Sequence, residues 1–227
     1  MSNQLAFMQL ADSFFPSGSF TLSHGLEYLV QTKQVTNVEE LQNFLQILVN
    51  HKLVPCDVVA LLHAYHGSKQ NCLATICEAD QQLFKQTLIA QNRSSQQKSG
   101  RALLKLAQTT WQDQKLESLQ HKSRTQEFAC LHPVVFATVA EIAGIDEVNT
   151  VLAFLHNFVT GILGVSIRLG IIGHLKAQQV LLAIAPDLET AHEQASQLNI
   201  HQMWSCTPTI DLAQMQHQKL RTKLFAS

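Results

Sequence analysis

The chain has 227 residues, of which 46% are hydrophobic and 15% are charged. This composition excludes a disordered chain, and the length suits one large domain that buries its own core. Sixteen Lys and Arg residues balance seventeen Asp and Glu residues, so the net charge of -1 provides no overall field to attract a phosphate backbone. We therefore expect a single domain over residues 1–227 that does not bind nucleic acid.

Five cysteines are scattered along the chain, an odd number that does not suit a framework of disulfides. Reduced thiols of this kind are typical of the cytosol. The first residues contain no basic run followed by an apolar stretch and a cleavage site, so no secretory signal is visible. We therefore expect a cytoplasmic protein.

Helical periodicity is clear from residue 38 onward. Thr36 and Glu39 have the spacing of a capping box, which satisfies free N–H groups at a helix start. Pro55 is expected to end or kink this helix, because proline lacks the N–H that an interior turn needs. A second apolar helix, residues 58–65, is expected to stop at Gly67 in a left-handed C-cap. The apolar positions behind the capping box are Val38, Leu41, Phe44, Leu45 and Leu48.

Two further apolar stripes, at residues 83–88 and 102–107, flank the polar stretch 91–100. This stretch is either the middle of one long helix or the break between two helices. Pro133 suits the first turn of another helix, where its missing N–H costs nothing, and Gly144 suits the end of that helix. The middle of the chain is therefore expected to be helical throughout.

The longest apolar stretch covers residues 151–172, and Asp146 is placed to cap its helix. Gly161 and Gly164 would let a neighbouring helix approach closely. The stretch is nearly long enough to span a bilayer, but polar residues such as Arg168 interrupt it. We therefore favour a helix buried in a helical core over a membrane span.

Two prolines divide the C-terminal third of the chain. Pro186 is expected to separate a short helix from a polar one, and Pro208 precedes the last helix. No alternating apolar run bounded by hairpin turns occurs anywhere in the sequence. The patterns together predict an all-α fold, a single-domain helical bundle with short connections.

The histidines supply the metal candidates. His63 and His66 lie three residues apart, which would place two imidazoles on one helical face within reach of one ion. Two ligands alone hold a metal weakly, and the alternative is a pair of histidines with their polar tips in solvent. Cys130 and His132 form a second possible pair, but we favour His132 before Pro133 as a helix start. These remain weak candidates, so no metal site is predicted.

The motifs of nucleotide and acyl chemistry are missing from the sequence. It contains no Gly-Lys-Ser/Thr phosphate loop, no dinucleotide fingerprint and no Gly-x-Ser-x-Gly elbow. We therefore predict no catalytic residue and no cofactor. The alternative is a helical metal- or haem-handling enzyme that uses histidine ligands such as His63 and His66.

A family resemblance begins near the N-terminus, where residues 10–20 read LADSFFPSGSF and residues 23–27 read SHGLE. The proline and glycine of the first stretch suit a tight turn that folds its phenylalanines back on the core. Both stretches strongly resemble the N-terminal signature of the UreF family of urease accessory proteins. The structural residues of this signature and of the His-Pro motif below are Pro16, Gly18, Phe20, Gly25, Glu27, His132 and Pro133.

Four further stretches resemble the family in the right order. Residues 93–104 read RSSQQKSGRALL, residues 132–136 read HPVVF, and residues 168–174 read RLGIIGH. Residues 211–225 are similar to the closing helix and tail of the family. Single positions depart from the pattern, such as His174 where Gln is usual. The resemblance therefore covers essentially the whole chain.

The resemblance implies a homodimer that binds the accessory protein UreD, also called UreH, and receives the nickel-carrying GTPase UreG. Through that complex it would help insert nickel into the urease apoprotein. It implies a scaffold and not an enzyme, because the GTP chemistry belongs to UreG. In the family, a basic residue in the segment that matches Arg168 is suspected of influencing that GTPase. The alternative for Arg168 is a salt bridge or a role as partner of a helix C-terminus.

The C-terminal segment, residues 220–227, is a candidate docking tail, although terminal residues usually fray. Its two apolar residues stand beside two basic ones, and an ordered Phe225 would serve as an anchor in a pocket of a partner. The alternative is that Phe225 packs back on its own bundle. The expected partner-binding residues are Arg168, His174, Arg221, Lys223, Leu224 and Phe225.

Overall fold

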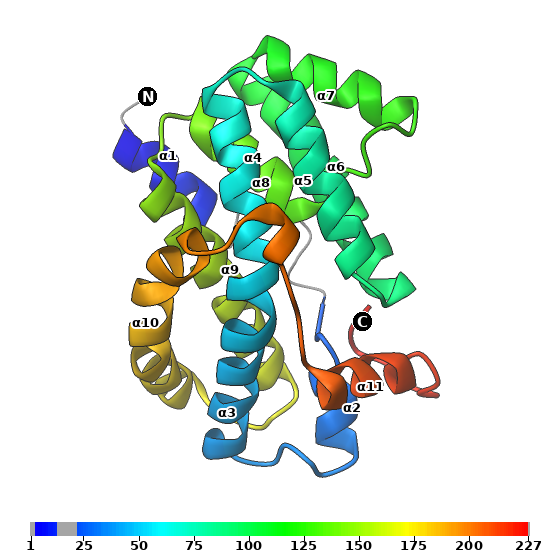
Figure 1. Cartoon of the computed structure of the whole chain (residues 1–227). Helices are drawn as coiled ribbons and strands as arrows, with labels where there is room; N and C mark the ends of the chain where they lie inside the picture. The colour runs from blue at the N-terminus through cyan, green and yellow to red at the C-terminus, as the bar shows by residue number, and fades with distance from the viewer. Residues whose placement is uncertain (1–2, 13–21, 227) are drawn as a thin grey trace.

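The structure is a computed structural model that describes residues 3–12 and 22–226, and every regular element in these two ranges is helical (Figure 1). The expected all-α fold is confirmed. The elements are α1 (Asn3–Ala11), α2 (Leu26–Gln31), α3 (Val38–Leu48), the π-helix η2 (Val49–Val58), α4 (Val59–Lys69), α5 (Leu73–Gln86), α6 (Ala90–Trp111), α7 (Gln114–Arg124), α8 (His132–Ile142), α9 (Glu147–Arg168), α10 (His174–Ser196), the 3-10 helix η3 (Ile200–Gln202) and α11 (Pro208–His217).

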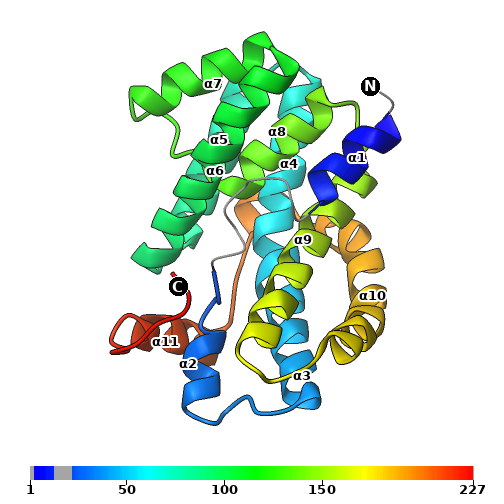
Figure 2. The same cartoon turned by 180° about the vertical axis from the view of Figure 1, so that it is seen from behind.

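Helices α4 and α8 occupy the centre of the bundle. They pack against each other, α4 also packs against α5, and α8 also packs against α6. Residues 133–140 of α8 are all buried, as a helix that is apolar on every side requires in water. Figures 1 and 2 show α1, α9 and α10 on one side of this centre and α5, α6 and α7 on the other.

The helix expected from residue 38 begins as predicted, but the capping residues are shifted by one position. Asn37 is the N-cap, and its side-chain oxygen accepts a hydrogen bond from the Glu40 N–H at 3.0 Å. The Glu40 carboxylate in turn accepts the Thr36 N–H at 2.6 Å. The pairing of Thr36 with Glu39 was therefore wrong, because two overlapping cap signals lie side by side in the sequence.

Pro55 does not end the helix, since α3, η2 and α4 form one continuous rod from Val38 to Lys69. The part of this helix that contains Pro55 is the π-helix η2, and backbone N–H groups of a segment near the C-terminal end of the chain donate hydrogen bonds to it. The Cys206 N–H donates to the carbonyl of His51, four residues before Pro55, at 2.9 Å. The Trp204 N–H donates to the Pro55 carbonyl at 3.2 Å. The donor that proline lacks is thus replaced by residues about 150 positions away.

Two other expected helix ends are also wrong. α4 continues past Gly67, and the left-handed residue that follows it is Asn71, with φ 53°. Gly67 is required for packing instead, because a Cβ there would lie 2.9 Å from the Thr75 Cβ of α5. Pro186 lies on the exposed side within α10, whose buried residues continue on both sides of it. Packing along the whole helix outweighs the local cost of the proline.

The polar stretch 91–100 lies wholly within α6, and the break between the two apolar stripes falls before it, at residues 87–89 between α5 and α6, so neither expected alternative is correct. Other local signals are confirmed. Pro133 stands in the first turn of α8, and Gly144 follows its end with φ 79°. Asp146 caps α9, since its side chain accepts the Asn149 N–H at 2.9 Å.

The environment of α9 differs from expectation at its glycines. Apart from the adjacent residues and the backbone of α9 itself, no atom of the described residues lies within 4 Å of a Cβ built at Gly161 or Gly164, so the predicted close approach of a neighbouring helix is wrong for the described residues. By length and composition, both Glu147–Arg168 and Val38–Lys69 could cross a membrane. However, 61% and 72% of their apolar windows are buried inside the bundle, as in core helices.

A buried carboxylate holds the connection that leads into α8. Asp80 of α5 is fully buried and accepts the N–H groups of Ala129, Cys130 and Leu131. Burial raises the pKa of Asp80 to about 6, against the opposite effect of these three donors. A Cβ at Gly100 would lie 1.9 Å from the Cys130 carbonyl oxygen, so α6 approaches this connection as only glycine allows.

Candidate partner-binding site at the C-terminal tail

The C-terminal tail, residues 218–226, follows α11 and turns back between α2 and the start of α6 (Figures 1 and 2). Gln31 of α2 donates to the Thr222 carbonyl at 3.5 Å, and Gln91 of α6 donates to the Ala226 carbonyl at 3.0 Å. The tail is therefore attached to helices from two other parts of the chain.

Glu27 is the centre of this attachment. Its side chain is fully buried, in the first turn of α2. One oxygen, Oε1, accepts the Leu224 N–H at 2.7 Å. The other, Oε2, accepts the Phe225 N–H at 3.3 Å and lies 2.7 Å from Nε2 of the buried His217. Two backbone N–H donors and the His217 ring thus provide polar contacts to a side chain whose burial would otherwise be costly.

Gly25 places Glu27 at this position. It precedes α2 with φ 85°, a conformation that residues with a Cβ rarely adopt. A Cβ there would also lie 3.0 Å from the side chain of Gln214 on α11. The glycine thus lets the start of α2 lie against α11, which carries His217.

Arg168 joins the tail to the end of α9. Its guanidinium carbon lies 4.6 Å from the centre of the Phe225 ring, a cation–π contact, and its Nε donates to the Gly164 carbonyl at 3.2 Å. Phe225 is only 6% exposed. Its side chain therefore packs on its own bundle, as the alternative interpretation expected, and the structure does not present it as an anchor for a partner.

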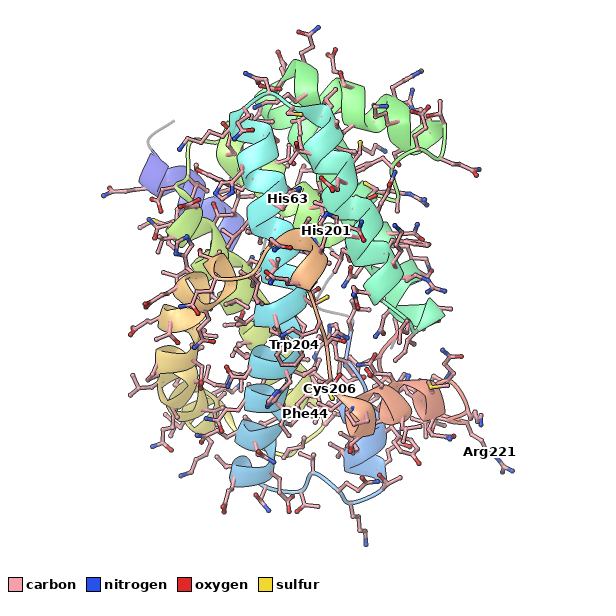
Figure 3. The ribbon with its side chains drawn as sticks, in the orientation of Figure 1. Phe44, His63, His201, Trp204, Cys206 and Arg221 are labelled. Carbon is pink, nitrogen blue, oxygen red and sulfur yellow. The ribbon has the colours of Figure 1, made fainter. Side chains whose placement is uncertain are left out.

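The remaining tail residues are exposed. Leu224 keeps 73% of its surface in solvent, and Arg221 and Lys223 are also exposed. Figure 3 shows Arg221 at the outer edge of the molecule, pointing away from it. His174 is the exposed first residue of α10, shortly after Arg168 in the chain. The tail thus combines a buried attachment with an exposed basic and apolar edge, which we call the tail platform: Arg221, Lys223 and Leu224.

The metal candidates His63 and His66 share α4 but contact different carboxylates. Nε2 of His63 lies 3.1 Å from Glu78, and Nε2 of His66 lies 2.7 Å from Glu147. Nε2 of His201 lies 3.6 Å from the other carboxylate oxygen of Glu78, and Figure 3 shows His201 close to His63. Across residues 3–12 and 22–226, no three His, Cys, Asp or Glu side chains are grouped to hold a metal ion.

The His-Pro motif lies at a helix start, which is the interpretation that the sequence favoured over a pair of metal ligands formed by Cys130 and His132. His132 is the first residue of α8, its Nε2 is buried without a hydrogen-bond partner among the described residues, and the side chain lines a mostly apolar cavity together with Gln96 and Asn157. Burial lowers the pKa of His132 to about 4, so its ring is neutral. Asp57 of η2 lines the same cavity, and burial raises its pKa to about 6. Sequence reasoning missed Asp57, because no local pattern distinguishes a π-helix from an α-helix.

Comparison with known proteins identifies the family. A profile described as UreF matches residues 35–185, which is more than half of the chain. A protein of Trichodesmium erythraeum (strain IMS101) is 55% identical over 227 residues, which covers 100% of this chain and 98% of the relative. The chain belongs to the UreF family.

More distant relatives align over their full lengths as well. A protein of Bacillus sp. (strain TB-90) is 30% identical, with 100% of both chains covered. One from Nostoc sp. (strain PCC 7120 / SAG 25.82 / UTEX 2576) is 26% identical, with 98% of this chain and 95% of the relative covered. All three relatives are named urease accessory protein UreF. UreF membership thus assigns an accessory role in urease maturation.

Three residues of the N-terminal UreF signature, Pro16, Gly18 and Phe20, lie outside the described residues. Two others, Gly25 and Glu27, lie at the buried attachment of the tail. The sequence marked Glu27 only as part of a helix start. Its contact with Leu224, 197 positions away, has no local signal.

Proposed function

We propose that this chain is a cytoplasmic, non-catalytic scaffold that binds UreD (UreH), recruits the GTPase UreG and so supports nickel insertion into the urease apoprotein. The observation that carries the proposal is the full-length similarity to proteins named urease accessory protein UreF. The sequence has no phosphate loop to hold a nucleotide, so GTP hydrolysis would come from UreG. The chain itself would hold no cofactor.

Deletion of the gene tests this function. We expect urease subunits to be made and assembled but to contain little nickel, because a scaffold for metal delivery does not affect subunit folding. Urease activity and nickel content would be measured at limiting nickel, with the wild-type gene restored as the control. Normal activity in the deletion strain would contradict the proposal.

The tail platform is the proposed contact for UreD. Arg168 contacts the tail through the Phe225 ring, and His174 is an exposed residue at the start of α10 that we include in the proposed interface. Its exposed Leu224 offers apolar area, and Arg221 and Lys223 offer charge for orientation. The buried Phe225 would contribute indirectly, because its contact with Arg168 holds the tail in place. Arg168 is exposed while it contacts the Phe225 ring, so it would be open to UreG with the tail in place. Phe225 therefore has a supporting role, and the other five expected residues are exposed and available to a partner.

The proposed homodimer would use the apolar groove between α1, α9 and α10. The groove is lined by Phe7, Leu152 and Leu181, among others, and Leu182 at its edge is 77% exposed. An isologous dimer would cover such a surface on both copies. Leu182→Glu is therefore expected to shift the chain to a monomer in sedimentation experiments. The exposed Leu212→Glu on α11 is the matched control, and a dimer that survives Leu182→Glu would contradict this surface.

A further inference from the structure

The positive charge of this nearly neutral chain is concentrated on one side of the bundle. Half of the sixteen Lys and Arg residues fall within residues 85–124, where only two acidic residues, Asp113 and Glu117, occur. Helix α6 contains no acidic residue at all. Figures 1 and 2 place α5, α6 and α7 together, on the side away from α10.

Four of these cations are exposed, and in the described residues they form no hydrogen bond or ion pair through their side chains. Three of them follow the spacing of one helical face of α6, and the fourth stands near the end of α5. Like charges three and four residues apart on a helix repel each other. We call this surface the basic face: Lys85, Lys98, Arg101 and Lys105.

A cleft between α5, α6 and the connection after α7 lies within this surface, and Lys85 and Arg101 both line it. Its two carboxylates already have partners. Asp80 accepts three backbone N–H groups, and Glu127 lies 2.8 Å from the ammonium group of Lys122. No acidic side chain of the cleft is therefore left to balance Lys85 and Arg101.

Apolar surface adjoins these charges. Phe84 is 37% exposed, with the guanidinium carbon of Arg93 5.2 Å from its ring centre, and Leu88 is 80% exposed. Arg93 itself is engaged by the carbonyls of Thr87 and Leu88. Exposed apolar groups can supply contact area to a partner protein, and the adjacent cations can orient a partner of opposite charge.

We propose that the basic face is a docking surface for a carboxylate-rich surface of another protein in the urease maturation assembly. The inference rests on the proposed function for the identity of that assembly, but it uses residues apart from the tail platform. A protein is favoured over nucleic acid because two of the four cations line a cleft that also has apolar lining, such as Phe84, and because the four do not form a long stripe.

The test compares two double charge reversals. Lys98→Glu with Arg101→Glu removes the basic face, and Lys33→Glu with Lys69→Glu makes the same change in net charge at exposed sites elsewhere. Dissociation constants of the full chain would be measured for purified UreD, UreG and urease apoprotein. We expect the first variant to lose about tenfold or more in affinity for one of these proteins at low salt, and less at high salt, with no such loss in the control.

The outcomes separate this inference from the proposed function. If the wild-type chain binds these proteins and both variants bind them with the same affinity, the docking role of the basic face is wrong and the proposed scaffold function is unaffected. If the wild-type chain binds none of them, both fail. If a DNA duplex binds the wild-type chain, and the first variant loses that binding alone, the surface serves nucleic acid and the inference is wrong.

Discussion

Two buried carboxylates, Asp80 and Glu27, do similar work in different parts of the molecule. Each stands on a helix, is 0% exposed and accepts backbone N–H groups from a non-helical segment distant in the chain. Asp80 holds the connection into the central helix α8, whereas Glu27 holds the C-terminal tail.

The difference lies in what each segment carries. The connection held by Asp80 passes directly into residues that are buried, so its loss would disturb the core. The tail held by Glu27 ends in exposed side chains, and only Phe225 of its last residues is buried. The same hydrogen-bonding device thus supports the fold in one place and presents a surface in the other.

The largest effect is expected at Asp80. Asp80→Ala would leave buried N–H groups without an acceptor, and we expect the free energy of unfolding to fall by about 3 kcal/mol or more. Asp80→Asn keeps one side-chain oxygen as an acceptor, so its free energy of unfolding should lie between those of Asp80→Ala and the wild type. Urea unfolding followed by circular dichroism measures both. A loss below about 1 kcal/mol for Asp80→Ala would show that these contacts contribute little.

The same residue gives a pH dependence. Since the pKa of Asp80 rises from 3.8 to about 6 on folding, the folded chain binds this proton more tightly than the unfolded chain. Its contribution to stability is therefore fully present below pH 3.8 and is lost as the pH rises through about 6. Asp80→Asn has no such proton, so its deficit relative to the wild type should shrink between pH 4 and pH 7. A constant deficit would contradict the raised pKa.

A smaller effect on stability is expected at Glu27. Glu27→Gln replaces one acceptor by a donor beside His217 and the tail N–H groups, at a cost of about 2 kcal/mol. Hydrogen exchange of residues 220–226 should rise more than that of α8. The exposed Glu39→Gln is the matched control. Equal exchange in the tail of both variants would mean that Glu27 does not hold it.

The smallest effect on stability is expected at Arg168. Arg168→Ala removes the contact with the Phe225 ring, which is worth about 0.5–1 kcal/mol at an exposed site. Tail exchange should increase while the melting temperature changes little. Arg168→Lys, which retains a cation, should restore part of the protection. If hydrogen exchange in the tail is the same in Arg168→Ala as in the wild type, Arg168 does not help to attach the tail.

Sequence reasoning succeeded where the signal was local. Asp146, Pro133 and Gly144 each act within one helical turn, and each was placed correctly. It failed where a distant segment compensates a local breaker, as Cys206 does for the π-helix around Pro55. Pro186 was misjudged because packing along both halves of α10 outweighs its local cost.

The candidate site was predicted only in part, for the same reason. The composition of the tail marked its basic and apolar residues, but not which of them would be buried. Leu224 and Phe225 are adjacent in the chain, but the Leu224 side chain is exposed, whereas the Phe225 side chain is buried and contacts Arg168 of α9. The spacing of His63 and His66 was compatible with one ion, but their partners come from α5 and α9, which the spacing does not describe.

The most direct test of the account is the nickel content of urease purified from a deletion strain that carries a variant tail platform. Arg221→Ala, Lys223→Ala and Leu224→Ala together change only exposed side chains and leave Phe225 and Glu27 in place. We expect this triple variant to be as stable as the wild type, to bind UreD at least about tenfold more weakly, and to leave urease short of nickel. Full nickel content and activity with the triple variant, at limiting nickel and wild-type expression, would contradict the account.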